Sequence, residues 1–300
     1  MNINQANLNK HLYISYTTND EINGIVHISH GMAEHVGRYQ WLISKFNDAG
    51  YHVYAANHRG HGSWIEDGHR SGYFSDKNGW ELVTEDLRNN IIAAQKNHPE
   101  LKQFLIGHSM GSWIALSVVQ SNINIDGLIL SGSAKLDTFS ILIQSSLVNL
   151  IFHLKGKYHE SLLMHKVTMQ KFNSFFKPNN TPNDWISSDR ESVDQYTKDP
   201  LCGFVVTIGL WKDTVDGLKQ IFLKDRYKNV NNDLPIYVIS GDKDPVGANG
   251  KLAKKLFNFL NSIFKNVSFD LISNARHEVF TERSKEANFY KVLSFMNKYC

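Results

Sequence analysis

Residues 104–119 restrict the fold of this chain more than any other segment. They run from apolar residues 104–106 through Gly-His-Ser-Met-Gly at 107–111 into a helix-like stretch at 113–119. A Gly-x-Ser-x-Gly sequence occurs by chance in many loops. Between a strand and a helix it is typical of a nucleophile elbow, a sharp turn that lifts the serine hydroxyl above a sheet, with glycines that avoid a Cβ clash. Ser109 is therefore the candidate nucleophile.

The candidate partners of this serine follow it in the chain. A serine hydroxyl is a weak nucleophile at neutral pH, so it needs a histidine base and a carboxylate that orients the histidine. In folds that carry such an elbow, the acid and then the histidine follow the serine in the chain, each after a later strand. A strand-like run at 234–240 ends in a turn that holds Asp242 and Asp244, and a second run at 267–272 precedes His277. His277 is the candidate base, and either aspartate fits the acid position.

Two backbone N–H groups are needed to hold the negative charge that develops on the substrate oxygen. In this architecture one comes from the residue after the serine, which is Met110. The other comes from the turn after an early strand, and the run at 22–29 places Met32 in that turn. The methionine side chains either line an acyl pocket or pack in the core, and both interpretations are open.

Strand-like runs alternate with helix-like segments such as 82–97 and 251–263. This alternation predicts an α/β fold with a mostly parallel central sheet and helices on both faces. After the strand-like run at 125–131, about 100 residues pass before the next core strand, whereas a crossover needs only about a dozen. We therefore expect a core formed by residues 1–132 and 234–300, with a helical cap inserted at 133–233.

The predicted cap opens with residues 139–154, which contain no Lys, Arg, Asp or Glu. An apolar helical stripe is formed there by Phe139, Ile143, Leu147, Leu150, Ile151 and Leu154, and it is widened by Ile141, Val148 and Phe152. The segment is shorter than the ~20 residues that span a bilayer. The stripe either packs against the core or lines an acyl tunnel and contacts lipid, since each buried methylene contributes ~0.8 kcal/mol.

Composition excludes several classes of protein. A net charge of +3 without a basic stripe argues against a nucleic-acid partner, and 42% hydrophobic residues suffice for one large core. Cys202 and Cys300 are too few for a disulfide framework, and no spacing of metal ligands or phosphate-binding loop is present, so we expect no metal and no cofactor. Residues 1–8 lack the features of a secretory signal, which predicts a cytoplasmic protein. The apolar start of the cap leaves peripheral contact with a membrane open. No oligomeric state is predicted.

Six spaced motifs resemble those of the α/β-hydrolases of the monoacylglycerol lipase and lysophospholipase group, classed with S33-type serine aminopeptidases. They are HGMAEHVGRY at 30–39, NHRGHGS at 57–63, GHSMG at 107–111, DQYTKDPL at 194–201, GDKDPVG at 241–247 and ARHE at 275–278. The resemblance covers nearly the whole chain. Asn57 replaces the usual aspartate of its motif, and Ser112 stands where a further glycine is common.

The resemblance implies roles for individual residues. It favours Asp244 over Asp242 as the orienting acid. It places Glu34 and Arg38 near the polar end of the substrate pocket, although a helix-start carboxylate and a surface arginine explain them equally well. Two more candidate substrate contacts follow from its motifs. His108 lies in the elbow, and Tyr196 lies in the cap, where it either contacts substrate or pins the cap.

The function that the resemblance implies is hydrolysis of the carboxylic esters of lipid-like substrates, monoacylglycerols or lysophospholipids, through an acyl-enzyme at Ser109. The same residues also suit a small-ester carboxylesterase, a thioesterase or an amide hydrolase. A catalytically silent ligand-binding α/β-hydrolase is a hypothesis of a different class, and such proteins normally lack one of the three catalytic residues.

Overall fold

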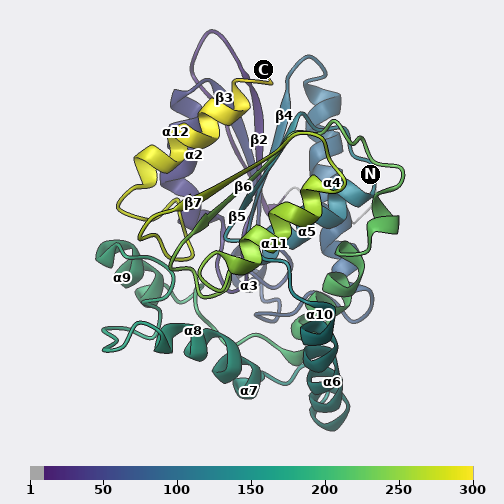
Figure 1. Ribbon diagram of the computed structural model, residues 1–300, viewed down its shortest axis with the longest axis vertical. Coiled ribbons are helices and arrows are strands. Elements are labelled where there is room, and N and C mark those ends of the chain that lie inside the picture. The colour runs from purple at the N-terminus through teal and green to yellow at the C-terminus, as the bar shows by residue number, and fades with distance from the viewer. Residues whose placement is uncertain (1–9, 300) are drawn as a thin grey trace.

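A seven-stranded sheet runs through the middle of the molecule, in the order β1-β3-β2-β4-β5-β6-β7 (Figure 1). This computed structural model describes residues 10–299, so the predictions about residues 1–8 and Cys300 lie outside the described part. The strands are β1 (Leu12–Ser15), β2 (Gly24–Ser29), β3 (Tyr51–Ala56), β4 (Gln103–His108), β5 (Gly127–Ser131), β6 (Ile236–Gly241) and β7 (Val267–Ile272). Only β1 among them pairs antiparallel, with β3, and the other neighbours are parallel.

The central strands are buried on both faces. Every residue of β2, β4, β5 and β6 is buried, as their mainly apolar sequences predict for a parallel sheet covered on two sides. The edge strands β1 and β7 contain exposed residues. The expected mostly parallel sheet is therefore confirmed.

Helices pack on both faces of the sheet, as expected. On one face, α2 (Gln40–Asp48) and α12 (Lys285–Met296) contribute the apolar residues that pack with β2, β3 and β4, and the rings of Phe46 and Phe289 meet at 5.1 Å. On the other face lie α4 (Gly79–Asn97), α5 (Met110–Gln120) and α11 (Lys251–Asn261). This arrangement is the α/β-hydrolase architecture that the sequence predicts.

The long segment between β5 and β6 is largely helical. Its helices are α6 (Thr138–Lys155), α7 (Leu162–His165), the π-helix η2 (Lys166–Gln170), α8 (Lys171–Ser174), α9 (Arg190–Lys198), α10 (Ile208–Ile221) and the 3-10 helix η3 (Lys224–Tyr227). Figure 1 shows α6–α9 grouped beyond one end of the sheet. We call residues 133–233 the cap.

Helix α6 exposes much of the apolar stripe that its sequence predicts. Phe139, Ile143, Leu150 and Leu154 of the stripe are exposed, with 74% of Phe139 and 71% of Leu154 accessible. The residues that α6 buries are Ile141, Ser145 and Val148. Burial of the whole stripe against the core is therefore wrong, although part of it is buried. Leu147, Ile151 and Phe152 pack against the core, and α10 lies beside the helix. No helix of residues 10–299 is both long and apolar enough to cross a bilayer.

Candidate active site

Ser109 lies at the sharp turn between β4 and α5. Its φ of 51° and ψ of −121° are strained for a residue with a Cβ, and its hydroxyl does not cap the helix. The backbone N–H of Ser109 donates to the Ser131 carbonyl at the end of β5, at 2.9 Å. The predicted elbow is thus present in the backbone, with the serine itself at a positive φ.

The two glycines of the elbow are needed for close packing. A Cβ on Gly107 would lie 2.6 Å from the Ser112 Cα. A Cβ on Gly111 would lie 2.1 Å from the Ser29 carbonyl oxygen of β2. Neither glycine has a positive φ. The Gly-x-Ser-x-Gly sequence is therefore set by how tightly α5 approaches the sheet.

Asp244 and His277 meet at the ends of β6 and β7. The Nδ1 atom of His277 lies 3.0 Å from Asp244 Oδ1, and the two side chains are 3% and 0% exposed. Asp244 is held in place by the Val246 N–H, which donates to the same oxygen at 2.9 Å. Asp242 points elsewhere, and its buried Oδ1 has no hydrogen-bond partner among the described residues.

The charge around His277 favours the protonated ring. Burial alone acts to lower the pKa of His277, but the carboxylates of Asp244, Glu278 and Glu34 outweigh it, so the pKa is raised above its ordinary value. A base with this environment accepts a proton readily and is charged over more of the acidic range.

Ser109 and His277 belong to the same small region. The ring of His108, which precedes Ser109, lies 4.8 Å from the ring of His277. A Cβ placed on Gly132, next to the Ser131 partner of Ser109, would lie 3.1 Å from His277 Cε1. No hydrogen bond joins the Ser109 hydroxyl to His277 within residues 10–299. Catalytic hydrogen bonds are often absent in the free enzyme and form once substrate binds.

The turn after β2 brings Met32 to the elbow. A Cβ on Gly31 would lie 3.2 Å from the Ser109 Cβ, so the turn borders the serine directly. Met110 is buried and Met32 is half-buried. The backbone N–H groups of both methionines lack a partner in the described part of the chain. Both amides are thus available to an oxygen held above Ser109.

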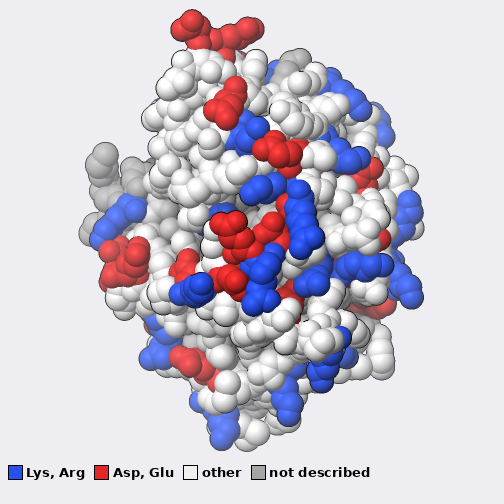
Figure 2. Space-filling view, turned by 90° about the vertical axis from the view of Figure 1, so that its left-hand side faces the viewer, with Lys and Arg blue, Asp and Glu red and all other residues white. Residues whose placement is uncertain are grey.

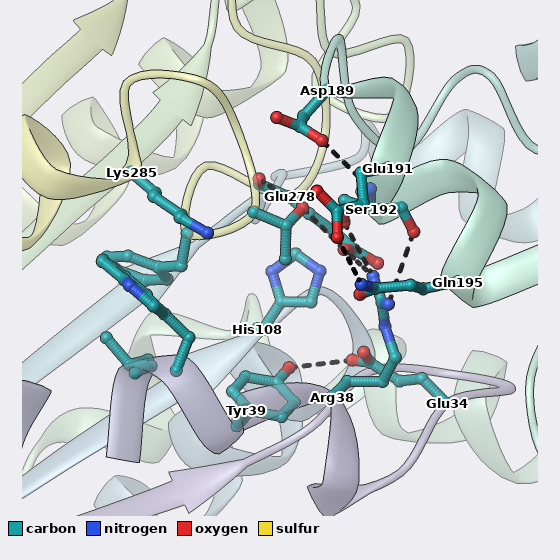
Figure 3. Close-up of a pocket in the computed structure, with 14 residues that line it drawn as sticks. Glu34, Arg38, Tyr39, His108, Asp189, Glu191, Ser192, Gln195, Glu278 and Lys285 are labelled. Atoms are coloured by element: carbon teal, nitrogen blue, oxygen red, sulfur yellow. Dashed lines mark hydrogen bonds and ion pairs between the residues drawn. The ribbon is translucent and has the colours of Figure 1, made fainter. Parts of the chain in front are cut away.

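A polar pocket opens next to these residues. It is lined by Glu34, Arg38, Tyr39, His108, Gln195, Glu278, Lys285 and seven other residues. They come from the segment between β2 and α2, from α2, from the end of β4, from α9 and the residue before it, and from residues 278–285. In Figure 3, His108 points into the middle of this pocket, between Lys285 and Gln195. Figure 2 shows the face of the molecule that lies on the left in Figure 1, and acidic and basic side chains gather in the middle of that face.

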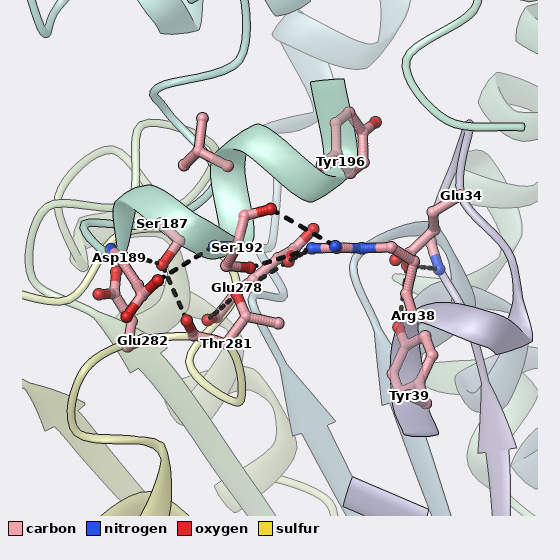
Figure 4. Close-up of polar contacts among 12 residues, drawn as sticks. Glu34, Arg38, Tyr39, Ser187, Asp189, Ser192, Tyr196, Glu278, Thr281 and Glu282 are labelled. Carbon is pink, nitrogen blue, oxygen red and sulfur yellow. Dashed lines mark hydrogen bonds and ion pairs between the residues drawn. The ribbon is translucent and has the colours of Figure 1, made fainter. Parts of the chain in front are cut away.

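Arg38 and Glu278 form a buried ion pair beside the pocket. Arg38 Nη2 lies 2.8 Å from Glu278 Oε2, and each side chain is 8% exposed (Figure 4). The surface-arginine interpretation of Arg38 is therefore wrong. Arg38 Nε is buried and has no partner among the described residues, and Arg38 also lines the pocket.

Glu34 is a buried carboxyl group rather than a solvated helix-start carboxylate. It accepts hydrogen bonds from the Gly31 N–H and, at 2.9 Å, from the Tyr39 hydroxyl. Burial, together with the nearby Glu278 carboxylate, raises the pKa of Glu34 to about 7. Burial acts in the same direction on Glu278, but Arg38 outweighs it and the pKa of Glu278 is lowered. Glu34 therefore exchanges a proton near neutral pH, while Glu278 stays ionised.

The cap supplies residues that the sequence did not single out. Trp185 places its ring 5.0 Å from the ring of His277. The Glu278 N–H donates to the Ile186 carbonyl at 2.7 Å, and Arg276 donates to the Ser187 carbonyl at 3.1 Å. These contacts join segments about 90 residues apart in the chain, so no local pattern points to them.

Tyr196 and Asp199 of the cap contact the turn after β2. The Tyr196 hydroxyl donates to the Ala33 carbonyl at 3.0 Å, and Asp199 lies 2.8 Å from His35 Nε2. His35, Asp199 and Cys202 also form the one group that has metal-ligand types close together within residues 10–299. His35 Nδ1 accepts the Gly37 N–H, so Nε2 carries the proton and donates to Asp199. Both ring nitrogens of His35 are thus engaged in hydrogen bonds that join the cap to the turn, and this arrangement does not fit a metal ligand.

The fold and this arrangement of serine, histidine and aspartate define an α/β-hydrolase of the serine type. The model of the family described as serine aminopeptidase, S33, matches residues 20–284. The chain belongs to that family, as its motifs predict.

Relatives of known name agree with this assignment. The chain is 28% identical over 294 residues to a monoacylglycerol lipase of Mycolicibacterium smegmatis, covering 95% of this chain and 92% of the relative. It is 30% identical over 182 residues to a monoglyceride lipase of Rattus norvegicus. That match covers 59% of this chain and 52% of the rat protein. A carboxyl esterase from Bacillus coagulans, solved with glycerol, superposes with a TM-score of 0.87 at 31% identity, covering 96% of this chain and 93% of the esterase.

Proposed function

We propose that this chain is a serine hydrolase that cleaves the carboxylic esters of lipid-like substrates, monoacylglycerols or lysophospholipids. The observation that carries the proposal is the buried Asp244–His277 pair beside a strained Ser109 whose hydroxyl makes no hydrogen bond within residues 10–299. The names of the relatives, monoacylglycerol lipase and carboxyl esterase, support the choice of substrate class.

In the proposed mechanism, His277 takes the proton of the Ser109 hydroxyl while the serine oxygen attacks the ester carbonyl carbon. The Met32 and Met110 amides hold the oxyanion of the tetrahedral intermediate. The ester C–O bond then breaks, His277 gives its proton to the departing alcohol, and an acyl-enzyme remains. His277 next takes a proton from water, whose oxygen attacks the acyl carbon. The bond from that carbon to Ser109 Oγ then breaks, His277 returns its proton to the serine oxygen, and the fatty acid and the free serine are released.

We propose the polar pocket as the site of the alcohol part of the substrate. Its Arg38 guanidinium and Glu34 carboxyl group are suited to hydrogen-bond hydroxyl groups of a glycerol moiety, and His108 of the elbow lines the same pocket. Lys285 lines the same pocket and offers a cation to a phosphate group. Replacing Lys285 with alanine is therefore expected to lower turnover of a lysophospholipid more than turnover of a monoacylglycerol.

We further propose that residues 133–233 act as a cap over a core of residues 1–132 and 234–300, and that α6 contacts a lipid surface. The exposed Phe139, Ile143 and Leu154 are held on a helix that shows no charged residue until Lys155. Serine at these three positions is expected to weaken binding to phospholipid vesicles and to leave turnover of a short soluble ester unchanged. A triple variant with alanine at Ser140, Gln144 and Ser146 of the same helix, which keeps the apolar stripe, is the control.

The first experiment is a panel of p-nitrophenyl esters from acetate to palmitate, with a monoacylglycerol and lysophosphatidylcholine, measured with the wild type and Ser109→Ala. The proposal expects activity that peaks at medium or long chains and is lost in S109A. Activity confined to acetate favours a small-ester esterase. Activity only on thioesters favours a thioesterase. Activity only on N-terminal amides favours an amide hydrolase, the activity that the description of the family as serine aminopeptidases names.

A fluorophosphonate probe separates an enzyme from a silent binding protein. Such a probe labels a serine only when a neighbouring base activates it. We expect labelling of the wild type and none of S109A or H277A. A folded wild type that stays unlabelled contradicts the proposed mechanism.

A further inference from the structure

The carbonyl oxygen of Ala33 receives two hydrogen bonds from the cap. The Tyr196 hydroxyl donates at 3.0 Å and the Gly203 backbone N–H donates at 2.9 Å. Ala33 follows Met32 directly, and its φ of 54° is strained for a residue with a Cβ. Such a conformation persists only where the surroundings hold it. The cap therefore fixes the shape of the turn that carries the Met32 amide.

We propose that Tyr196 is a positioning residue for the hydrolytic reaction. By holding the Ala33 carbonyl, its hydroxyl keeps the neighbouring Met32 amide directed at the developing oxyanion. The inference rests on the proposed function, because it takes Met32 as an oxyanion donor. Its consequence is that the cap takes part in the chemical step as well as in substrate binding.

The surroundings of Tyr196 favour this role over a contact with substrate. The side chain is 5% exposed, and its hydroxyl is already used by Ala33. The Arg38 guanidinium lies 5.3 Å from the centre of the ring, which comes from α9 above the Arg38 side chain (Figure 4). Burial raises the pKa of Tyr196 well above its usual value, so the hydroxyl stays protonated and remains a donor.

The same cap motif makes a second contact with the turn. Asp199, at the end of α9, pairs with His35 Nε2 at 2.8 Å and also accepts the Leu201 N–H at 2.8 Å. Tyr196 and Asp199 are three residues apart, a spacing that puts both on one side of a helix end. The Tyr-x-x-Asp part of the motif thus clamps both ends of the segment Ala33–His35.

A positioning role and a purely structural role predict different kinetics. An oxyanion donor acts mainly in the transition state, so misplacing it lowers kcat and leaves KM unchanged. A residue that only pins the cap changes stability or KM. A residue that binds the substrate in the ground state raises KM with kcat unchanged.

The test compares Y196F with Y158F in the full-length protein. Tyr158 is also in the cap, but it is half-exposed and its hydroxyl donates to Asp76. For each variant we measure kcat and KM with a medium-chain p-nitrophenyl ester, and inhibition by a trifluoromethyl ketone, which forms a tetrahedral adduct with an oxyanion. Fluorophosphonate titration counts the folded, active molecules in every sample.

Loss of a whole oxyanion donor costs ~10²–10³ in rate, and a misplaced one costs less, so we expect kcat to fall about tenfold in Y196F. The affinity for the trifluoromethyl ketone falls by the same factor, KM stays within about twofold, and Y158F behaves as the wild type. A raised KM with unchanged kcat and ketone affinity overturns the inference, as does an unchanged Y196F. If S109A keeps its activity, the proposed function fails as well, whereas an inactive S109A with an unaffected Y196F refutes the positioning role alone.

Discussion

Replacing Asp244 with asparagine separates the charge of the Asp244–His277 pair from its geometry. Oδ1 of Asp244 accepts hydrogen bonds from both His277 Nδ1 and the Val246 N–H, at 3.0 and 2.9 Å. Oδ2 lies 3.5 Å from the Ser240 hydroxyl, which can accept as well as donate. An asparagine can therefore keep its carbonyl oxygen at the Oδ1 position and turn its amide group toward Ser240. D244N keeps the orientation and tautomer of the His277 ring and removes only the charge.

The magnitude follows from the charge of the imidazolium that forms during the reaction. Two unit charges about 4 Å apart interact by about 4 kcal/mol at an effective dielectric constant of ~20, which corresponds to roughly 10³ in rate. D244A also loses the oxygen that fixes the tautomer, so its rate is expected to fall by about 10⁴ or more. The difference between the two variants measures the geometric contribution.

The pH dependence gives an independent check. Burial lowers the pKa of His277 and Asp244 is the main group that raises it, so removing the carboxylate lowers this pKa. The base then stays unprotonated to lower pH, and the acidic limb of kcat/KM moves to lower pH in D244N. The assay is the pH profile of p-nitrophenyl ester hydrolysis for wild type, D244N and D244A. A loss below about tenfold in D244N, or an acidic limb that does not move, refutes the reasoning.

Three further substitutions test the packing around the site. G111A puts a Cβ 2.1 Å from the Ser29 carbonyl oxygen, so denaturant titration should show a loss of about 3 kcal/mol, and an unchanged midpoint contradicts the close approach. Burial, with Glu278, raises the pKa of Glu34 to about 7 from 4.5, so the folded state binds more protons between these values. Stability then falls by roughly 3 kcal/mol as pH rises through this range, and E34Q should remove that fall. R38M leaves Glu278 buried and unpaired and should cost roughly 3–5 kcal/mol, most of which R38M/E278M should restore, as measured by denaturant titration.

The central part of the fold was predictable because its sequence signals are local. The apolar runs of β2, β4, β5 and β6 show the pattern of a covered parallel sheet, and the alternation in β7 shows that of a last strand, without any knowledge of distant residues. The burial of a histidine in β3, whose sequence is YHVYAA, is explained by a distant partner, as is the burial of His27 in β2. His52 Nδ1 accepts the Thr17 N–H at 3.1 Å, a contact that only the folded chain reveals.

For the candidate site, spacing and order bring Ser109, Asp244 and His277 to one end of the sheet, as expected. The sequence did not reveal the electrostatics of the pocket, because these depend on long-range pairs. Arg38 and Glu278 are 240 residues apart, and either alone looks like a surface residue. The direction of α6 was also undecided in the sequence, since an apolar stripe suits a core and a lipid surface equally well.

The turn that carries Met32 is fixed on its inner side by a neutral histidine. His30 Nε2 accepts the His58 N–H at 2.9 Å, so this atom carries no proton and Nδ1 carries it. The Nδ1–H group then donates to the Gly31 carbonyl at 2.8 Å. Burial lowers the pKa of His30 well below its usual value, so this tautomer is kept across the working pH range. Because the peptide group is planar and trans, holding the Gly31 carbonyl directs the Met32 N–H away from His30.

The Met32 amide therefore lies between two anchored carbonyl groups, that of Gly31 on the core side and that of Ala33 on the cap side. The core anchor consists of buried side chains below the sheet ends and is independent of the cap. The cap anchor depends on Tyr196 and Gly203, which are attached to a segment with a large exposed apolar face. Any displacement of the cap that breaks these two hydrogen bonds and the Asp199–His35 pair leaves the turn held from the core side only, with a strained Ala33 free to relax. We therefore expect a lipid contact that displaces the cap to act on the proposed oxyanion site through the Ala33 carbonyl and the Asp199–His35 pair.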